Sequence, residues 1–240
     1  MNRSILDFDF MWRSIPRIAL GIPVSISIAM IAFILGSLIG LGVALVKIRR
    51  TPVFYQICTV YTSFMRGTPL LAQIFLCFYG FPLVLRYLNG YYKWNLDISS
   101  IPAIVFMYYC FALNVGAYLS ETIRSALLAV PQGQLEAASS LGMTDSQRFI
   151  RITLPQAALV ALPNMGNTFI ALLKDTSLAF AASVPEIIGQ AKITAARSSN
   201  FLEAYIVAAV LYWIICVILE RLLLFFEGKL RTHERGRKAA

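Results

Sequence analysis

The sequence predicts an all-α integral membrane protein with about five transmembrane helices. Of the 240 residues, 58% are hydrophobic and only 14% are charged, and the mean hydropathy is +0.70. Soluble domains contain about 45–50% apolar and about 25% charged residues. A soluble domain of this size also keeps roughly a quarter to a third of its chain surface in water. It could not hide this many apolar side chains, and a disordered chain would have far fewer of them. We therefore expect lipid to be the main solvent.

Five intervals without charged residues are long enough to be transmembrane helices, because crossing about 30 Å of hydrocarbon takes about 20 helical residues. The expected spans are residues 18–46, 67–85, 98–120, 152–173 and 204–219, the last extended through 222–226. The first is too long for a signal-peptide core and is followed by basic residues rather than by a cleavage site. It is therefore expected to remain as a helix.

Small residues recur every fourth position along the first span, at Ala32, Gly36, Gly40 and Ala44. Such a face lets another helix approach closely in a membrane. The alternative is a span that is merely rich in glycine, and the sequence favours neither interpretation over the other.

Basic residues set the expected orientation. With the N-terminus outside, twelve Lys and Arg residues fall on the inner side and eight on the outer side, and Arg66 lies within the second span. Because basic residues concentrate in cytoplasmic segments, we expect the N-terminus outside and the C-terminus in the cytoplasm. Residues 1–17 are expected to form an interfacial segment, 18–227 a single transmembrane domain, and 228–240 a basic cytoplasmic tail.

The net charge of +9 does not predict nucleic-acid binding, because the basic residues that flank membrane spans account for this surplus. The four cysteines are scattered through apolar stretches, and the single histidine, His233, lies in the polar tail. Neither residue type has the spacing of a metal site, so we expect no bound metal and no nucleic-acid partner.

The polar segment 129–155 is longer than a turn between two helices requires. Residues 134–141 favour a short helix, and Gly142 can end it with a positive φ. Thr144 and Gln147 fit a capping box that starts a second short helix, which we expect to end at Leu154 and Pro155, where the fourth span begins. A helix with small residues on one face suits insertion into a groove of a partner, although an ordinary amphipathic loop helix would show the same pattern.

Several motifs together resemble one family, the permease subunits of bacterial ABC importers for polar amino acids. Glu136-Ala137-Ala138 with Gly142 and Ile152-Thr153-Leu154-Pro155 resembles the EAA loop of these permeases. Four further stretches are similar to signatures of the polar amino-acid branch: residues 64–71 (FMRGTPLL), 114–121 (NVGAYLSE), 166–169 (GNTF) and 173–178 (LKDTSL). Any one motif is weak, but five in order on five spans are specific.

The resemblance implies the fold of type I, MetI-like importers and a subunit that is not an enzyme. It implies as partners two ABC ATPase subunits, an extracytoplasmic substrate-binding protein, a second permease subunit in a homodimer or heterodimer, the amino-acid substrate, and the bilayer of the bacterial plasma membrane. ATP and Mg would bind the partner ATPase, since this chain has no GxxxxGK[ST] motif and is expected to hold no cofactor. The residues expected to couple to the ATPase are Glu136, Ala137, Ala138, Gly142, Leu154 and Pro155.

Polar residues within or beside the spans are candidates for a substrate pathway or its gate, because a charge near the bilayer centre costs about 2.5–3.5 kcal/mol on insertion scales. The candidates are Arg66, Gly67, Thr68, Glu121, Lys174, Asp175, Thr176 and Ser177. A free amino acid is a zwitterion and needs partners of both signs. The same groups could instead form ion pairs that gate the pathway, and Asn114, Asn167 and Thr168 could serve only as hydrogen-bond partners between helices.

Two other functions remain as alternatives. An intramembrane enzyme would need paired acids, histidines or a GxSxG motif, none of which occurs. A secondary transporter would be expected to show an internal repeat. The substrate is expected to be a polar amino acid, and residues 172–180 (LLKDTSLAF) look most like those of permeases for cystine and related sulfur amino acids.

Overall fold

The computed structural model describes residues 6–94 and 97–238, with side chains to residue 229. Within this part of the chain, five helices are long and apolar enough to cross a membrane: Ile22–Arg49, Leu70–Tyr92, Ala103–Leu128, Asp145–Ala182 and Phe201–Lys229. The five expected spans are thus confirmed. Their ends differ from the charge-free intervals, because charged side chains near a helix end do not interrupt the helix.

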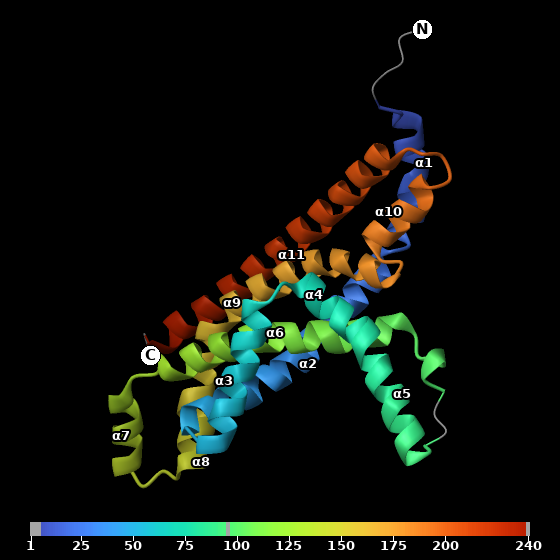
Figure 1. Cartoon of the computed structure of the whole chain (residues 1–240). Helices are drawn as coiled ribbons and strands as arrows, with labels where there is room; N and C mark the ends of the chain where they lie inside the picture. Colours follow the sequence, from blue (N-terminus) through green and yellow to red (C-terminus); the bar gives the residue numbers. More distant parts are fainter. Residues whose placement is uncertain (1–5, 95–96, 239–240) are drawn as a thin grey trace.

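The helices follow one another along the chain with short connections. In order they are α1 (Phe8–Ala19), α2 (Ile22–Arg49), α3 (Pro52–Gly67), α4 (Leu70–Phe75), η1 (Leu76–Gly80), α5 (Phe81–Tyr92), η2 (Ile98–Ser100), α6 (Ala103–Leu128), α7 (Gln132–Ser140), α8 (Asp145–Arg148), η3 (Phe149–Thr153), α9 (Leu154–Asp175), η4 (Thr176–Ala182), α10 (Ile187–Ala195) and α11 (Phe201–Lys238). Figure 1 shows α7 and α8 at one end of the bundle and α1 and α10 at the other. We call these the α7 end and the α10 end.

The terminal segments are helical where they are described. The segment expected at 1–17 contains α1, which packs on α10 and α11, and the backbone N–H of Asp7 donates to Glu203 on α11. Residues 1–5 lie outside the described residues. The tail expected at 228–240 continues α11 as far as Lys238, and residues 239–240 are not described.

The small-residue face of α2 forms the largest contact between two helices in the described chain, with α6. All four of its residues are buried. A Cβ placed on Gly36 would lie 3.1 Å from the carbonyl oxygen of Ala112, and one on Gly40 would lie 3.0 Å from the backbone nitrogen of Ser120. The face therefore serves helix packing, which decides between the two interpretations of the sequence.

The second span is broken, which the sequence interval 67–85 did not predict. Helix α3 ends at Gly67, Thr68 and Pro69 are extended, and α4 begins at Leu70. The span then continues through the π-helical turn η1 into α5 (Figure 1). The expected start at residue 67 is thus wrong, because a separate 16-residue helix precedes the break.

Buried side-chain amides bond to the backbone carbonyls at this break. The Nε2 atom of Gln73 donates to the carbonyls of Met65 (2.9 Å) and Thr68 (3.2 Å) and to Oγ1 of Thr68 (2.8 Å). Asn114 on α6 donates to Oε1 of Gln73 at 2.9 Å and to the carbonyl of Met65 at 3.4 Å. In a bilayer every such group needs a partner within the protein, so these two amides make the break possible.

The segment 174–200, expected to be irregular, contains η4 and α10. Glu186 lies between the spans at the α10 end and is fully buried. Its carboxylate accepts hydrogen bonds from the N–H groups of Ile188 (2.8 Å) and Gly189 (2.7 Å) and from the hydroxyl of Tyr212 (2.8 Å). Burial outweighs these bonds and raises the pKa of Glu186 to about 7. One carboxyl group therefore caps α10 and joins it to α11.

Replacing Gly40 by valine is expected to lower the free energy of unfolding by about 1–3 kcal/mol, since the added side chain pushes α6 off its contact. Thermal unfolding of the purified protein in detergent measures the effect. Gly42→Val is the matched control, because a Cβ at Gly42 meets no atom within 4 Å. Equal melting temperatures for the two variants would contradict the assignment of this face.

Replacing Gln73 by leucine is expected to cost about 1–3 kcal/mol of stability, because buried carbonyl groups at the break lose their donor. The same unfolding measurement applies, with Gln56→Leu on the exposed face of α3 as the control. If Gln73→Leu unfolds at the wild-type temperature, the break does not depend on this amide.

Candidate functional site

A polar cavity of about 260 Å³ lies beside the break in the second span. Residues from four segments line it: Thr68, Leu70, Asn114, Val115, Tyr118, Thr168, Ala171, Leu172, Asp175 and Leu178. Its polar groups are two hydroxyls, an amide, a phenol and one carboxylate. These groups can donate to a carboxylate and accept from an ammonium group, as a zwitterionic ligand requires.

Four of the expected pathway residues lie at this cavity or next to it. Thr68 and Asp175 line it. The guanidinium carbon of Arg66 lies 5.6 Å from the ring centre of Tyr118, which is itself a lining residue. Gly67 is the last residue of α3 and lies directly before the break.

Lys174, Thr176 and Ser177 do not line the cavity. Lys174 is exposed. Thr176 is fully buried, donates to the carbonyl of Leu173 at 2.6 Å, and lies 3.3 Å from the hydroxyl of Tyr212 on α11. Of the two adjacent charges at 174 and 175, the structure brings only the aspartate to the cavity.

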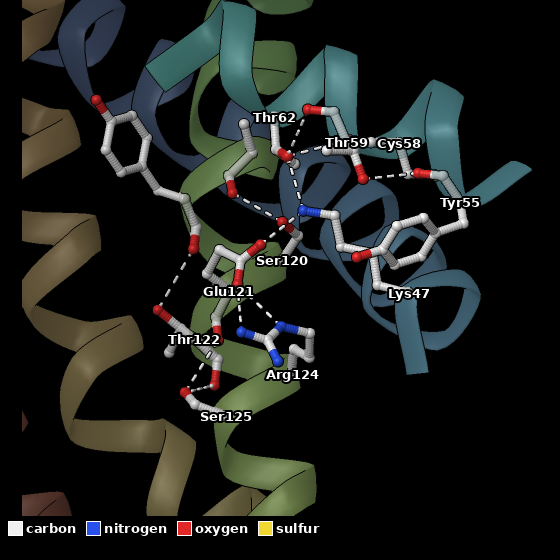
Figure 2. A network of polar contacts seen from close by, with 12 residues as sticks. Lys47, Tyr55, Cys58, Thr59, Thr62, Ser120, Glu121, Thr122, Arg124 and Ser125 are labelled. Carbon is white, nitrogen blue, oxygen red and sulfur yellow. Dashed lines mark hydrogen bonds and ion pairs between the residues drawn. The ribbon is translucent and has the colours of Figure 1, made fainter. Parts of the chain in front are cut away.

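Glu121 lies away from the cavity, at the α7 end of α6. It is seven residues after Asn114, or about 10 Å along the helix axis. Its Oε1 accepts from Nζ of Lys47 at 2.7 Å, and its Oε2 pairs with Arg124 at 2.8 Å. Nζ of Lys47 also donates to Oγ1 of Thr62 on α3 at 2.7 Å, as Figure 2 shows. This network joins α2, α3 and α6.

The loop between α6 and α9 has the predicted form of two short helices joined at a glycine. Gly142 has a φ of 77°, and its N–H donates to the carbonyl of Ser139. Met143 N–H donates to the carbonyl of Ala138, which completes a helix stop of the Schellman type. The capping box of Thr144 and Gln147 is present as expected. The segment is thus a fixed bend.

The loop presents part of its predicted coupling surface to the outside. Glu136, Ala137 and Gly142 are exposed, and Leu141 has 84% of its surface exposed. Ala138, which was expected to allow close approach of a partner, is 3% exposed and packs inside the loop.

Polar contacts tie this loop to its own helices. The guanidinium of Arg148 on α8 donates to Oγ of Ser139 on α7 and pairs with Asp145. Gln156 on α9 donates to Oε1 of Gln134 on α7 at 2.7 Å. The loop is therefore attached directly to the first turn of α9.

Leu154 and Pro155 are exposed residues in the first turn of α9. The second short helix was expected to end here, and this is wrong: α8 continues through the π-helical turn η3 into α9. Pro155 has no N–H group, and in the first turn of α9 that group has no partner to lose. The wider π-helical turn η3 before it keeps the helix continuous.

Several residues of these networks were not among the predicted site residues, and Gln73 and Lys47 are two of them. Gln73 is the one carboxamide in the charge-free interval 67–85, and this was a signal that could have found it. Lys47 was interpreted only as a charge that flanks a span. Asn114 was favoured as a structural hydrogen-bond partner, and it both makes such bonds and lines the cavity.

No three His, Cys, Asp or Glu side chains come together as a metal site would require, within the residues that the structure describes. The cysteines at 58, 77, 110 and 216 are free thiols.

Comparisons with known proteins identify the family. Residues 32–232 match the family model of the binding-protein-dependent transport system inner membrane component. The L-cystine transport system permease protein TcyB of Bacillus subtilis (strain 168) is 40% identical over 205 residues, covering 85% of this chain and 82% of that protein. Both alignments include the break, the cavity and the loop.

Solved structures agree with the expected fold. The crystal structure of an amino acid ABC transporter with histidines contains a chain that is 30% identical, with a TM-score of 0.80, and the match covers 94% of this chain and 100% of that one. An inward-facing MetNI methionine ABC transporter contains one with a TM-score of 0.60 at 17% identity, covering 91% and 98%, which supports the MetI-like fold.

These findings do not favour an intramembrane enzyme or a secondary transporter. Catalysis of ATP hydrolysis belongs to a partner chain in this family. The chain belongs to the family of binding-protein-dependent transport system inner membrane components, and it is a membrane-spanning permease subunit of an ATP-driven amino-acid importer.

Proposed function

We propose that the cavity beside the broken span is where this permease contacts its amino-acid substrate. The carboxylate of Asp175 faces the α-amino group, and the hydroxyl of Tyr118 donates to the α-carboxylate. Arg66, on the ring of Tyr118, adds a positive charge near the cavity. Both charges of a zwitterion then meet a partner, which lowers the cost of moving it away from water.

The observation that carries the proposal is that one helix, α9, joins the cavity to the loop. Its first turn is bonded to α7 through Gln156 and Gln134, and its last residue is Asp175. Its 22 residues span about 33 Å. A movement of the loop therefore reaches the cavity wall through one continuous helix, with Pro163 in its interior.

In the proposed mechanism the α7–α8 loop docks into a groove on an ATPase subunit. Glu136, Ala137, Gly142 and the exposed Leu141 face that subunit, while Leu154 and Pro155 fix the start of α9. Burial of Leu141 against a partner removes its exposed apolar surface from water. Closure of two ATPases around ATP then tilts α6 and α9.

The proposed assembly contains two ABC ATPase subunits, a second permease subunit as a homodimer or heterodimer, and an extracytoplasmic substrate-binding protein. ATP and Mg bind the ATPases, and this chain binds no cofactor. The α7 end faces the cytoplasm of a bacterial cell and the N-terminus lies outside, in accordance with the excess of basic residues at 47–50, 124–151 and 221–238.

The proposed substrate is a polar amino acid, and cystine or a related sulfur amino acid is our best assignment. It rests on residues 172–180 and on the similarity to the L-cystine permease TcyB. Competition by unlabelled amino acids against the uptake of a radiolabelled amino acid in proteoliposomes tests this assignment. If arginine or glutamine competes and cystine does not, the assignment to cystine is wrong.

Replacing Gly142 by leucine is expected to uncouple ATP hydrolysis from uptake, because a φ of 77° strains a branched side chain and shifts the bend. In proteoliposomes containing the ATPase and the binding protein, uptake should fall about tenfold or more while hydrolysis continues. Gly142→Asn tolerates this backbone conformation and should retain most of the uptake.

Gly133→Leu is the control for this prediction, since Gly133 lies on the same loop, has no positive φ, and has open space around its Cβ position. Normal coupled uptake by Gly142→Leu would contradict the role of the bend.

Replacing Asp175 by asparagine is expected to reduce uptake about tenfold or more, because the substrate loses the one carboxylate among the residues that line the cavity. Lys174→Met is the matched control, since this neighbouring charge does not line the cavity, and its uptake should change less than threefold. The measurement is initial uptake at saturating binding protein. Equal losses in the two variants would point to an ion pair that gates the pathway rather than to contact with substrate.

A further inference from the structure

A second polar cavity, of about 240 Å³, lies at the α7 end between α2, α3 and α6. Its lining residues are Lys47, Arg50, Tyr55, Thr59, Glu121 and Arg124. They are three cations, two hydroxyl groups and one carboxylate. The substrate pathway and the coupling loop do not use this cavity.

The charges in this cavity do not balance. Glu121 already accepts from Lys47 and from Arg124. Arg50 takes part in none of the ion pairs found among the described residues. The cavity therefore has a surplus of two positive charges, and a surplus of this kind in a confined space attracts an anion.

The turn between α2 and α3 fixes the position of Arg50. Arg50 is the C-cap of α2 with a φ of 52°, and its N–H donates to the carbonyl of Val46. Pro52 begins α3 two residues later. This places the guanidinium group directly after the last turn of a membrane span, at the level where lipid headgroups begin.

Helix α3, which contributes to the cavity, also has exposed apolar side chains on its opposite face. Val53, Phe54 and Ile57 are 66%, 60% and 59% exposed. Tyr55 and Thr59 on the same helix face the cavity, as Figure 2 shows beside Lys47. A cationic cavity at the end of the membrane spans α2 and α6 matches a molecule with an anionic head and hydrocarbon tails, because the head can reach the cations while the tails stay in the hydrocarbon.

We propose that this cavity binds the phosphate headgroup of an anionic phospholipid, with the acyl chains in the surrounding hydrocarbon. Basic cavities between transmembrane helices on the cytoplasmic side recognise such headgroups. Free phosphate would use the same cations but would not require their position at the end of the membrane spans α2 and α6. This proposal rests on the proposed function in one respect only: the cytoplasmic orientation of the α7 end determines which leaflet supplies the lipid.

The test is native mass spectrometry of the full chain in detergent, titrated with phosphatidylglycerol or with phosphatidylcholine. Wild type should retain phosphatidylglycerol in preference to phosphatidylcholine. Arg50→Asn should lower that retention about fivefold, as expected for one cation near a charged headgroup, because asparagine keeps the left-handed backbone while removing the charge.

Lys93→Asn is the matched control, because Lys93 is also a basic C-cap with a φ of 52° but ends α5 at a different site. It should retain lipid as wild type does. Equal retention by the two variants, or equal retention of the two lipids by wild type, would overturn the proposal.

Two further arms separate the alternative occupants. Displacement of phosphatidylglycerol by millimolar inorganic phosphate would assign the cavity to free phosphate instead. If Arg50→Asn forms less dimer than wild type but retains as much lipid per chain, the exposed surface of α3 would be assigned to contact with a second permease subunit. Lipid retention does not require transport. A failure of the lipid prediction would therefore leave the uptake predictions intact, and a failure of the uptake predictions would leave the lipid prediction intact.

Discussion

The hydrogen bonds of the Gln73 amide are the interaction on which this architecture depends. A membrane span can be interrupted only where the freed backbone groups find partners inside the protein. Gln73 and Asn114 supply those partners for the carbonyls of Met65 and Thr68. The interruption in turn brings Thr68 to the cavity wall opposite Asp175. Without the amides, an unbroken helix would present only side chains there, and the polar cavity would be smaller.

The break is held in place by a rigid pair of helices. The glycines of α2 let its backbone lie against that of α6, so that Asn114 stands on a wall that cannot move independently of α2. Helix α9 also contacts α6, and it has the loop at one end and Asp175 at the other. Asn114 on α6 and Asp175 on α9 both line the cavity, so a displacement of one helix relative to the other at the loop changes the cavity.

The sequence predicted those features whose signals are local. The five spans follow from charge-free length, the α2 face from a four-residue period of small side chains, and the loop from Gly142 and the capping box. It did not predict the break, although Gly67 and Pro69 within FMRGTPLL signal the end of a helix, because the interval was defined by the absence of charge alone. It also missed the burial of Ala138 and the pairing of Lys47 with Glu121. Both depend on contacts between residues distant in the chain, which one sequence without relatives does not reveal.

The position of Glu121 changes the meaning of the charges near the membrane. By residue type alone it belonged with Asp175 as a candidate for the pathway, yet two cations neutralise it at the α7 end. Only Asp175 and Arg66 then remain as charges at or beside the cavity, one of each sign, which is the minimum that a zwitterion needs. Glu121 instead holds Lys47 and Arg124 together against their mutual repulsion, two turns before α6 leads into the loop. Because Lys47 also donates to Thr62 on α3, the network joins α3 to the same helix that leads to α7, and a movement of the loop reaches α3 from α6 as well as the cavity from α9.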